Sequence, residues 1–213
     1  VALNCVANGK ILKNSNFKNL WVQPAAGDAG GALGAALAVW YKKFNKSRKA
    51  IKNDSMKGSL LGPEFSQKQI TDSLNHLGAK FEVMDDISII KATVKALMEG
   101  KAIGWYQGRM EFGPRALGSR SIIADPRNDT MQKILNLKVK YRESFRPFAP
   151  SVLNEDVSRW FNLNCDSPYM LFVDEVNAKK KCSMTQRERK LFGIDKLNVK
   201  RSEIPAVTHV DYS

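Results

Sequence analysis

Eight of the nine cationic side chains in one stretch of the sequence, residues 102–152, lie near its glycines and prolines, and their types suit the binding of phosphate or carboxylate oxygens. They are Arg109, Arg115, Arg120, Arg127, Lys138, Lys140, Arg142 and Arg146. Glycine and proline recur among them and fix the backbone of a loop, so that long cationic side chains can converge. The planar fork of arginine matches phosphate and carboxylate geometry. The stretch therefore predicts an oxyanion-binding cage for a phosphorylated small molecule or a nucleotide, with a solvated basic loop as the alternative.

Strands and helices must position these side chains. Apolar runs at residues 102–106 and 148–153 predict buried strands on either side of the basic loops. Further strands are expected at residues 20–22, 80–84 and 169–173, the last being too apolar for an exposed edge. Helical periodicity and capping residues predict helices at residues 1–9, 67–77, 87–98, 129–137 and 154–161, and another that ends near residue 44. Strands that alternate with helices indicate an α/β domain built on a mixed sheet.

The composition is ordinary for a globular protein, because 43% of the 213 residues are hydrophobic and 26% are charged. No apolar run is as long as a membrane span, so no membrane partner is expected. The three cysteines form no Cys-x-x-Cys pair, and His76 and His209 are far apart. This argues against a disulfide framework, a zinc site and a Ser-His or Cys-His catalytic pair. Free thiols without a signal-peptide pattern indicate a cytoplasmic protein.

The net charge of +13 is concentrated in three blocks. Residues 42–52 and 176–203 are typical of solvated basic surface, with Lys179, Lys180 and Lys181 as examples. Only the central block combines positive charge with a constrained backbone. RNA binding would need stacking aromatics on an exposed sheet, so nucleic acid is not the expected partner. A non-catalytic module that binds nucleotide, phosphate or RNA is the alternative to an enzyme.

Two runs in the basic stretch carry a family resemblance. Residues 107–122 read QGRMEFGPRALGSRSI, with ADPR at 124–127, and residues 140–150 read KYRESFRPFAP. With this spacing they resemble the signature of the C-terminal domain of O-carbamoyltransferases of the NodU/CmcH family. They are also similar to a segment of YrdC-like domains, which make acyl-adenylates from ATP. The resemblance implies a YrdC-like, mixed-sheet α/β domain and a carbamoyltransferase.

The N-terminal stretch resembles another part of the same family. Small residues in GDAGGA, residues 27–32, let a phosphate or ribose approach the backbone, or simply allow tight packing. This run and VALN at residues 1–4 resemble motifs of the family's N-terminal domain, which is of the ASKHA (actin-like ATPase) type. The resemblance implies a short ASKHA remnant at residues 1–50 and the YrdC-like domain at residues 51–213. A polar segment at residues 45–62 is the expected linker.

The resemblance also assigns roles to particular residues. Arg109, Arg115 and Arg120 are expected to act in catalysis by holding carbamoyl phosphate. The residues expected to bind the nucleotide are Lys140, Arg142, Arg146, Ser213, Asn4, Gly27, Gly30 and Gly31. Ser213 would be the serine of a Ser-Ala-Arg-Val-Gln segment of the family, although Tyr212 stands where the family has glycine.

Two metal ions enter through this resemblance. Mg²⁺ is expected to arrive with ATP and to meet Glu111 or Asp125 through water, although Asp125 before Pro126 is also a typical turn residue. Asp28 corresponds to an iron ligand of the family, whose two partner histidines lie in a His-x-x-x-His motif that this sequence lacks. One carboxylate does not hold a transition metal, so Fe²⁺ is expected only in a full-length enzyme.

The implied activity has two half-reactions. Carbamoyl phosphate and ATP form carbamoyl-adenylate, and the carbamoyl group then passes to a hydroxyl of a glycoside, an antibiotic or a nodulation-factor-like acceptor. The first step needs cations that gather two polyanions, not a protein nucleophile, which fits the residue types of the basic stretch. The chain is expected to be a fragment without the full transfer activity. Its residues 1–44 are expected to pack on the following domain or to mediate self-association, as in a homodimer.

Overall fold

The computed structural model describes all 213 residues, and the chain forms two compact units. Unit 1 consists of Val1–Val83, Trp105–Ser121 and Ser167–Val173. Unit 2 consists of Met84–Gly104, Ile122–Asp166 and Asp174–Ser213. Each unit is therefore assembled from stretches that are far apart in the sequence. No helix is long and apolar enough to cross a lipid bilayer.

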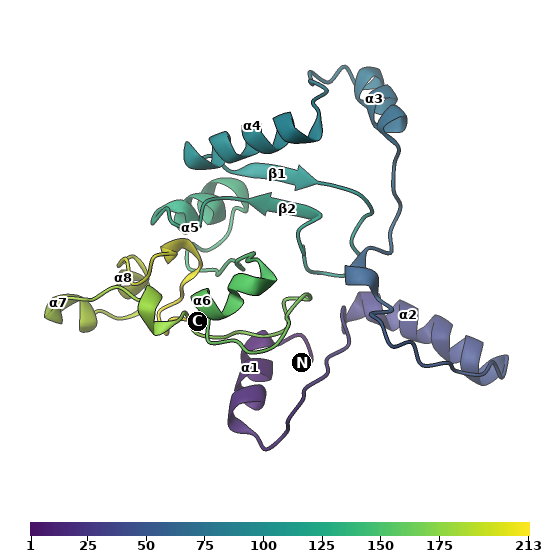
Figure 1. The fold of residues 1–213 in the computed structure, drawn as a ribbon, viewed down its shortest axis with the longest axis horizontal. Coiled ribbons are helices and arrows are strands. Elements are labelled where there is room, and N and C mark those ends of the chain that lie inside the picture. The colour runs from purple at the N-terminus through teal and green to yellow at the C-terminus, as the bar shows by residue number, and fades with distance from the viewer. The chain divides into compact units, whose positions relative to one another are not determined.

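Helices and one small antiparallel sheet make up the regular structure. The sheet pairs β1, Ile103–Tyr106, with β2, Arg120–Ile123 (Figure 1). The strand expected at residues 102–106 is confirmed, but it is not fully buried, because its residues alternate between half-buried and exposed. β2 was not predicted, because it lies among the glycines and arginines of the basic stretch. The α/β class is thus confirmed in its coarse form, as helices with a two-stranded sheet.

Four expected strands are wrong. Residues 20–22, 80–84, 148–153 and 169–173 form no strand, so the mixed sheet that they would have built is not present. A short apolar run is a strand only when another backbone pairs with it, and periodicity alone cannot supply that partner. Residues 169–173 are apolar because part of this segment is buried, although it does not pair as a strand. Leu171 is buried in unit 1, and its carbonyl accepts a hydrogen bond of 3.1 Å from the Asn8 side chain.

The helices of unit 1 follow their capping signals. α1 is Cys5–Asn14, α2 is Asp28–Ala38 with a π-helical extension Val39–Lys43, and α3 is Gln67–His76. A short 3-10 helix, Lys57–Ser59, lies between α2 and α3. The capping box of Ser66 and Gln69 starts α3 as predicted. The helix expected to end near residue 44 is confirmed, and none of the residues of α2 is buried.

Gly9 does not end the first helix, contrary to expectation. α1 continues to Asn14, and Gly9 lies in its interior as one of the two buried residues of this helix. A Cβ atom at Gly9 would overlap the carbonyl oxygen of Val173. The glycine therefore serves the close approach of two backbones, not a change in helix direction.

The helices of unit 2 are mostly short. α4 is Asp86–Met98, α5 is Met131–Ile134 with a π-helical extension Leu135–Val139, and α6 is Val157–Trp160 after a 3-10 turn Asn154–Asp156. These elements confirm the helices predicted at residues 87–98, 129–137 and 154–161. The C-terminal part adds Ala178–Lys180 and Pro205–Val207, which are 3-10 helices, and the unpredicted α7, Gln186–Arg189, and α8, Gly193–Leu197.

The small hydrophobic core of unit 2 is centred on α5. Met131, Leu135 and Ala206 are buried together, with Ala124 and Phe148 packed against them. Phe148 therefore fills the core from an irregular segment, where a strand was expected. A hydrogen bond of 3.1 Å from the Ala206 amide to the Pro126 carbonyl ties the C-terminal segment to this core.

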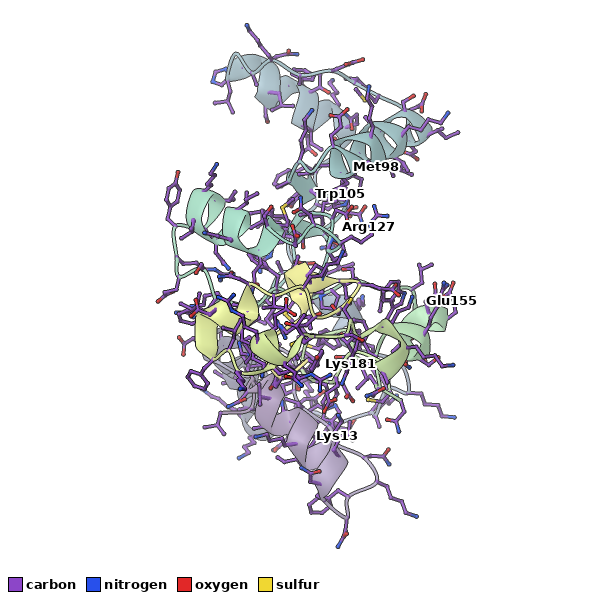
Figure 2. All side chains as sticks on the ribbon, turned by 90° about the vertical axis from the view of Figure 1, so that its left-hand side faces the viewer. Lys13, Met98, Trp105, Arg127, Glu155 and Lys181 are labelled. Atoms are coloured by element: carbon purple, nitrogen blue, oxygen red, sulfur yellow. The ribbon has the colours of Figure 1, made fainter.

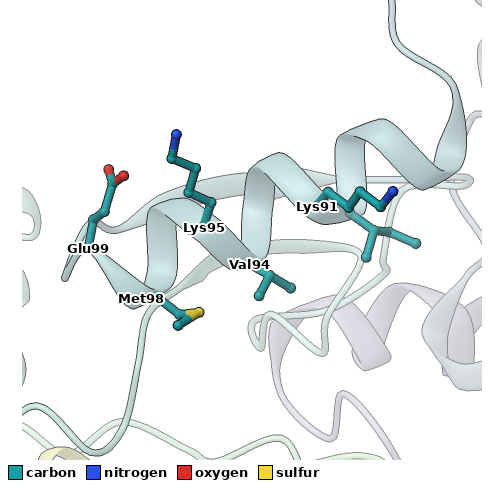
Figure 3. Close-up of a pocket in the computed structure, with 6 residues that line it drawn as sticks. Lys91, Val94, Lys95, Met98 and Glu99 are labelled. Atoms are coloured by element: carbon teal, nitrogen blue, oxygen red, sulfur yellow. The ribbon is translucent and has the colours of Figure 1, made fainter.

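The apolar side of α4 is uncovered. Ile90, Val94 and Met98 line a shallow hollow of about 480 Å³ on the helix surface. Figure 3 shows Val94 and Met98 on one side of the helix and Lys95 and Glu99 on another. Met98 is 73% exposed, so the amphipathic pattern of this helix does not contribute a buried face here.

We predict that Gly9→Ala destabilises the protein. Alanine favours a helix interior by about 1 kcal/mol over glycine, but the overlap with Val173 forces a backbone shift of α1 and makes the net change unfavourable by about 1–3 kcal/mol. Gly31→Ala is the matched control in α2, since a Cβ there meets nothing within 4 Å. Thermal or urea unfolding measures both variants. Equal stabilisation by the two substitutions would contradict the packing role of Gly9.

Candidate functional site

The arginine loop of unit 1 is built around the carboxylate of Glu111, which is only 5% exposed. The Leu117 amide donates to both carboxylate oxygens at 3.0 and 3.1 Å, and the Ser119 amide donates at 2.8 Å. Arg120 Nε adds a contact of 3.3 Å. A buried carboxylate is tolerated only when such donors surround it. Glu111 therefore organises the loop, and its oxygens are already engaged by the protein.

Arg120 helps to close the same loop. Besides its contact with Glu111, its Nη2 donates a hydrogen bond of 2.5 Å to the carbonyl of Gly113. Gly113 has a φ of +113°, a conformation that side chains rarely adopt. Of the three arginines expected to hold carbamoyl phosphate, Arg120 is thus the one whose fork is largely occupied by loop contacts.

Arg115 has a free hydrogen-bond donor inside the protein. Its Nη2 donates to the carbonyl of Leu3 at 2.6 Å, whereas its Nε is buried without any partner. Arg115 is also one of the residues that line a hollow of about 10 Å³. The other walls of this hollow are Leu3, Ala25, Ser59, Phe112, Pro114, Leu117 and Tyr169. Because a buried donor without a partner is costly, this nitrogen is suited to one oxygen atom of a ligand or to a water.

Arg109 lies at the exposed end of the loop. Its Nη1 is 3.9 Å from Glu64 Oε2, and both side chains are at least half exposed. Such a pair contributes little to stability, so the guanidinium is free to turn toward a ligand.

The loop of unit 2 that carries Lys140, Arg142 and Arg146 is held by a completely buried amide. Asn136 donates from Nδ2 to the carbonyls of Ser144 at 3.1 Å and of Arg146 at 2.9 Å. Its Oδ1 accepts a hydrogen bond of 2.6 Å from Arg142 Nε. The three cationic residues expected to bind nucleotide phosphates therefore share one loop, whose shape is set from the helical segment at residues 131–139.

The three cations of this loop differ in their freedom. Arg142 Cζ lies over the Phe148 ring, 5.0 Å from its centroid, and the hydrogen bond of this side chain to the protein is made by Nε, not by the Nη groups. Arg146 Nε pairs with Glu143 at 3.0 Å on the surface, and this hydrogen bond holds the pKa of Glu143 below its usual range. Lys140 is exposed and makes no side-chain contact.

The N-terminal candidates are mainly structural. Asn4 caps α1, because its side chain accepts a 3.0 Å hydrogen bond from the Ala7 amide. Gly27 is the N-cap of α2 and Asp28 its exposed first residue. A Cβ atom at Gly30 would overlap the backbone of Ala25, whereas Gly31 has open space around it. Within the chain, no group of three His, Cys, Asp or Glu side chains could hold a metal ion around Asp28 or elsewhere.

Ser213 and Asp125 make local contacts. Ser213 Oγ donates to Asp211 Oδ1 at 2.6 Å, and Asp211 also lies 3.5 Å from His209 Nδ1, so the serine is not activated by the histidine. Asp125 accepts hydrogen bonds from the backbone and side chain of Arg127 at 2.7 to 3.1 Å. These contacts lower the pKa of Asp125. Asp125 thus has the turn-forming role that was the alternative to a contact with Mg²⁺.

The prediction that Lys179, Lys180 and Lys181 are solvated is wrong for two of them. Lys180 pairs with Glu203 at 2.7 Å and stacks on the Trp160 ring at 4.3 Å. Lys181, labelled in Figure 2, pairs with Glu175 at 3.0 Å and stacks on Tyr212 at 4.4 Å. Aromatic and acidic partners distant in sequence cover them, and the spacing of charges does not reveal such partners.

The same basic block also contains a buried arginine. Arg201 is 1% exposed and donates hydrogen bonds to the carbonyls of Lys196, Thr208 and His209. Burial lowers the pKa of Arg201 because it disfavours the charged guanidinium. By contrast, the cations of residues 42–52 are all exposed, as predicted.

Tyr169, which lines the hollow, is hydrogen-bonded to Asp54, a contact that the sequence did not suggest. Asp54 accepts hydrogen bonds from the amides of Met56 at 3.0 Å and Gly58 at 2.9 Å, and from the Tyr169 hydroxyl. The Tyr169 hydrogen bond lowers the pKa of Asp54. Burial, together with Asp54, raises the pKa of Tyr169 to about 12. The sequence signal for this contact is weak, since an Asp four residues before a Gly indicates only a turn.

The sequence matches two parts of the proteins of one family, a C-terminal part and an N-terminal part. Residues 94–213 match the family described as "Carbamoyltransferase C-terminus", and residues 1–37 match "Carbamoyltransferase N-terminus". This chain therefore belongs to the carbamoyltransferase family, in agreement with its resemblance to NodU/CmcH proteins.

Several curated relatives are longer than this chain. The uncharacterised protein sll1178 of Synechocystis sp. is 54% identical over 100% of this chain and 35% of its own length. The nodulation protein NolNO of Sinorhizobium fredii is 40% identical over 99% of the chain and 28% of its own length. The 3'-hydroxymethylcephem-O-carbamoyltransferase of Streptomyces clavuligerus is 30% identical over 99% and 34%, respectively. The chain thus spans about a third of the length of these relatives.

We predict that Glu111→Gln loosens the arginine loop. In glutamine an NH2 group, which is a hydrogen-bond donor, replaces one of the carboxylate oxygens that now accept hydrogen bonds. Two donors then face each other, so the free energy of unfolding should fall by about 1–3 kcal/mol. Glu143→Gln is the matched control, since Glu143 and its partner Arg146 are both 53% exposed, and its effect should stay below about 1 kcal/mol. Urea unfolding compares the two, and equal losses would refute the organising role of Glu111.

A second prediction concerns pH. Because the folded-state pKa of Tyr169 is raised to about 12, above the ordinary value near 10, its contribution to stability is fully present below pH ~10 and is lost as the pH rises toward 12. Tyrosinate absorbance should show one late-ionising tyrosine, and this late step should be absent in Tyr169→Phe. A titration of Tyr169→Phe that matches the unsubstituted protein would refute the assignment.

Proposed function

We propose that this chain provides the carbamoyl phosphate- and ATP-binding part of an ATP-dependent O-carbamoyltransferase. Membership of the carbamoyltransferase family supports the reaction class. The observation that carries the proposal is Arg115, whose Nε is buried without a protein partner and which is one of the residues that line a small hollow. A phosphate or carboxylate oxygen is the partner that this nitrogen lacks.

The first half-reaction makes an activated carbamoyl group. Water cleaves carbamoyl phosphate into carbamate and inorganic phosphate. A carbamate oxygen then attacks the α-phosphorus of ATP, and the bond to pyrophosphate breaks, which yields carbamoyl-adenylate. Neither step requires a nucleophile from the protein, but both require cations that stabilise charge on moving phosphoryl oxygens.

The cationic residues divide between the two substrates. In unit 1, Arg115 and Arg109 bind the phosphate of carbamoyl phosphate, and Arg120 holds their loop in shape through Glu111. In unit 2, Lys140, Arg142 and Arg146 bind the phosphates of ATP, with Mg²⁺ entering as part of the nucleotide. Arg142 suits this role because Nε is bonded to Asn136 and Cζ lies over the Phe148 ring, while the Nη groups make no hydrogen bond to the protein.

The second half-reaction transfers the carbamoyl group to a hydroxyl. The carbonyl carbon of carbamoyl-adenylate accepts the hydroxyl oxygen, AMP leaves, and the hydroxyl proton is lost. A hydroxymethyl group is the acceptor named for the Streptomyces clavuligerus relative, and a glycoside, antibiotic or nodulation-factor-like hydroxyl is the acceptor class proposed here. In this scheme residues 51–213 are a YrdC-like domain and residues 1–50 an ASKHA remnant, in a cytoplasmic enzyme.

Iron has no complete site among these residues. Asp28 is the only proposed ligand, and no cluster of metal-ligating side chains lies near it. Because one carboxylate does not hold a transition metal, an iron site that includes Asp28 would need further ligands from elsewhere.

The direct test is exchange of labelled pyrophosphate into ATP. Exchange that depends on carbamoyl phosphate is the expected result, because the adenylation step is reversible. Binding of both substrates without exchange would indicate a non-catalytic binding module. Binding of RNA that weakens steeply with salt, without either activity, would indicate a nucleic-acid-binding protein.

We predict that Arg115→Lys weakens the binding of carbamoyl phosphate. Lysine keeps the charge but loses the fork that reaches both Leu3 and the hollow, so the dissociation constant should rise roughly 10- to 100-fold. Arg48→Lys is the matched control, because Arg48 is exposed and makes no side-chain contact. Calorimetry at one fixed salt concentration compares them. Equal changes for the two variants would identify a diffuse basic surface and exclude a defined site at Arg115.

A further inference from the structure

The second half of the expected linker lies along the arginine loop of unit 1. We call residues 54–63 the clasp segment. The Phe112 amide donates to the Ser59 carbonyl at 2.7 Å, the Gly62 amide donates to the Met110 carbonyl at 2.9 Å, and the Met110 amide donates to the Pro63 carbonyl at 2.9 Å. These three bonds fix the chain just before Gly113 and Arg115. The clasp segment is therefore part of the framework of the candidate site.

The conformation of the clasp segment is unusual and needs support. Lys57, Gly58 and Ser59 have successive φ values of +48°, +65° and +65°. Side chains disfavour this region, so such a turn persists only when its surroundings hold it. Ser59 is also 2% exposed, which leaves little space for another arrangement.

Asp54 and Tyr169 supply this support. The Asp54 carboxylate accepts from the amides of Met56 and Gly58 at the start and middle of the turn. The Tyr169 hydroxyl donates a hydrogen bond to the same carboxylate and accepts one of 3.0 Å from the Gly58 amide. The Tyr169 hydroxyl thus connects Asp54 and Gly58 to a segment more than a hundred residues later in the chain.

The same tyrosine reaches the site directly. Tyr169 and Ser59 line the hollow that Arg115 borders, together with Phe112. Ser59 of the turn, Phe112 and Arg115 therefore line the same hollow. A shift of the clasp segment changes the position of Phe112 through its 2.7 Å hydrogen bond, and Arg115 follows three residues later.

We propose that Tyr169 and Asp54 are positioning residues for Arg115, and that their contact sets the affinity of the unit 1 site for the phosphorylated carbamoyl donor. This inference rests on the proposed function. Neither residue needs to touch the substrate. Each acts through the clasp segment, which holds the loop that carries Arg115 beside the hollow.

The test compares Tyr169→Phe with Tyr41→Phe. Phenylalanine keeps the ring of Tyr169 and removes only the hydroxyl, whereas Tyr41 is a half-buried tyrosine outside the clasp segment, without a side-chain hydrogen bond. Calorimetry with carbamoyl phosphate should show about tenfold weaker binding for Tyr169→Phe, the effect of a lost hydrogen bond to a charged group. Binding of a non-hydrolysable ATP analogue should not change, and Tyr41→Phe should bind both ligands normally.

Hydrogen exchange gives a readout that does not depend on activity. In Tyr169→Phe, the amides of Gly58 and Phe112 should exchange faster, while the Arg142 amide, bonded to Asn136 at 2.9 Å, should keep its protection. The double variant Tyr169→Phe with Arg115→Lys should lose less affinity than the two single losses multiplied together, because the two residues act on one contact.

Several outcomes would overturn the inference. Unchanged affinity for carbamoyl phosphate in Tyr169→Phe would show that the contact does not position Arg115. Equal losses for both ligands, with faster exchange throughout the chain, would show a purely structural residue. If the unsubstituted protein binds no carbamoyl phosphate, the proposed function fails and takes this inference with it. If that protein binds the donor and Tyr169→Phe binds it equally well, only the inference fails.

Discussion

The rest of the candidate site depends on one buried carboxylate. Glu111 gathers the amides of Leu117 and Ser119 and the guanidinium of Arg120, so the glycine-rich chain between them folds back on an anion that the protein itself supplies. Without such a centre, neighbouring arginines would repel one another and extend into solvent. An internal anion lets the loop close and still leaves Arg115 to face a ligand.

In unit 2, the neutral side-chain amide of Asn136 shapes a cationic loop, as the carboxylate of Glu111 does in unit 1. The amide of Asn136 has one acceptor and two donor hydrogens, and the structure uses both ends: it accepts from Arg142 and donates to the carbonyls of Ser144 and Arg146. This arrangement shapes the loop without cancelling its charge. Lys140, Arg142 and Arg146 thus keep a net positive field, which attracts anions in general.

Charge in this chain has more than one purpose. The cations of residues 42–52 are exposed, and of these only Lys46 lies over an aromatic ring, that of Trp40. By contrast, Lys180, Lys181 and Arg201 are held against aromatic rings, carboxylates or carbonyls in the C-terminal part. A high net charge is therefore weak evidence for a nucleic-acid partner, since part of it is used within the fold.

The sequence by itself determined most of the longer helices and the family to which the chain belongs. Capping residues such as Ser66, and apolar periodicity in α4, act within one or two turns, so they can be read locally. The arginines and their family resemblance likewise indicated an oxyanion site in a carbamoyltransferase. Only the tertiary structure decided which apolar runs pair as strands, that Arg115 keeps a free Nε while Arg120 does not, and that Tyr169 meets Asp54. These outcomes depend on partners distant in the chain, and no local pattern encodes the identity of such a partner.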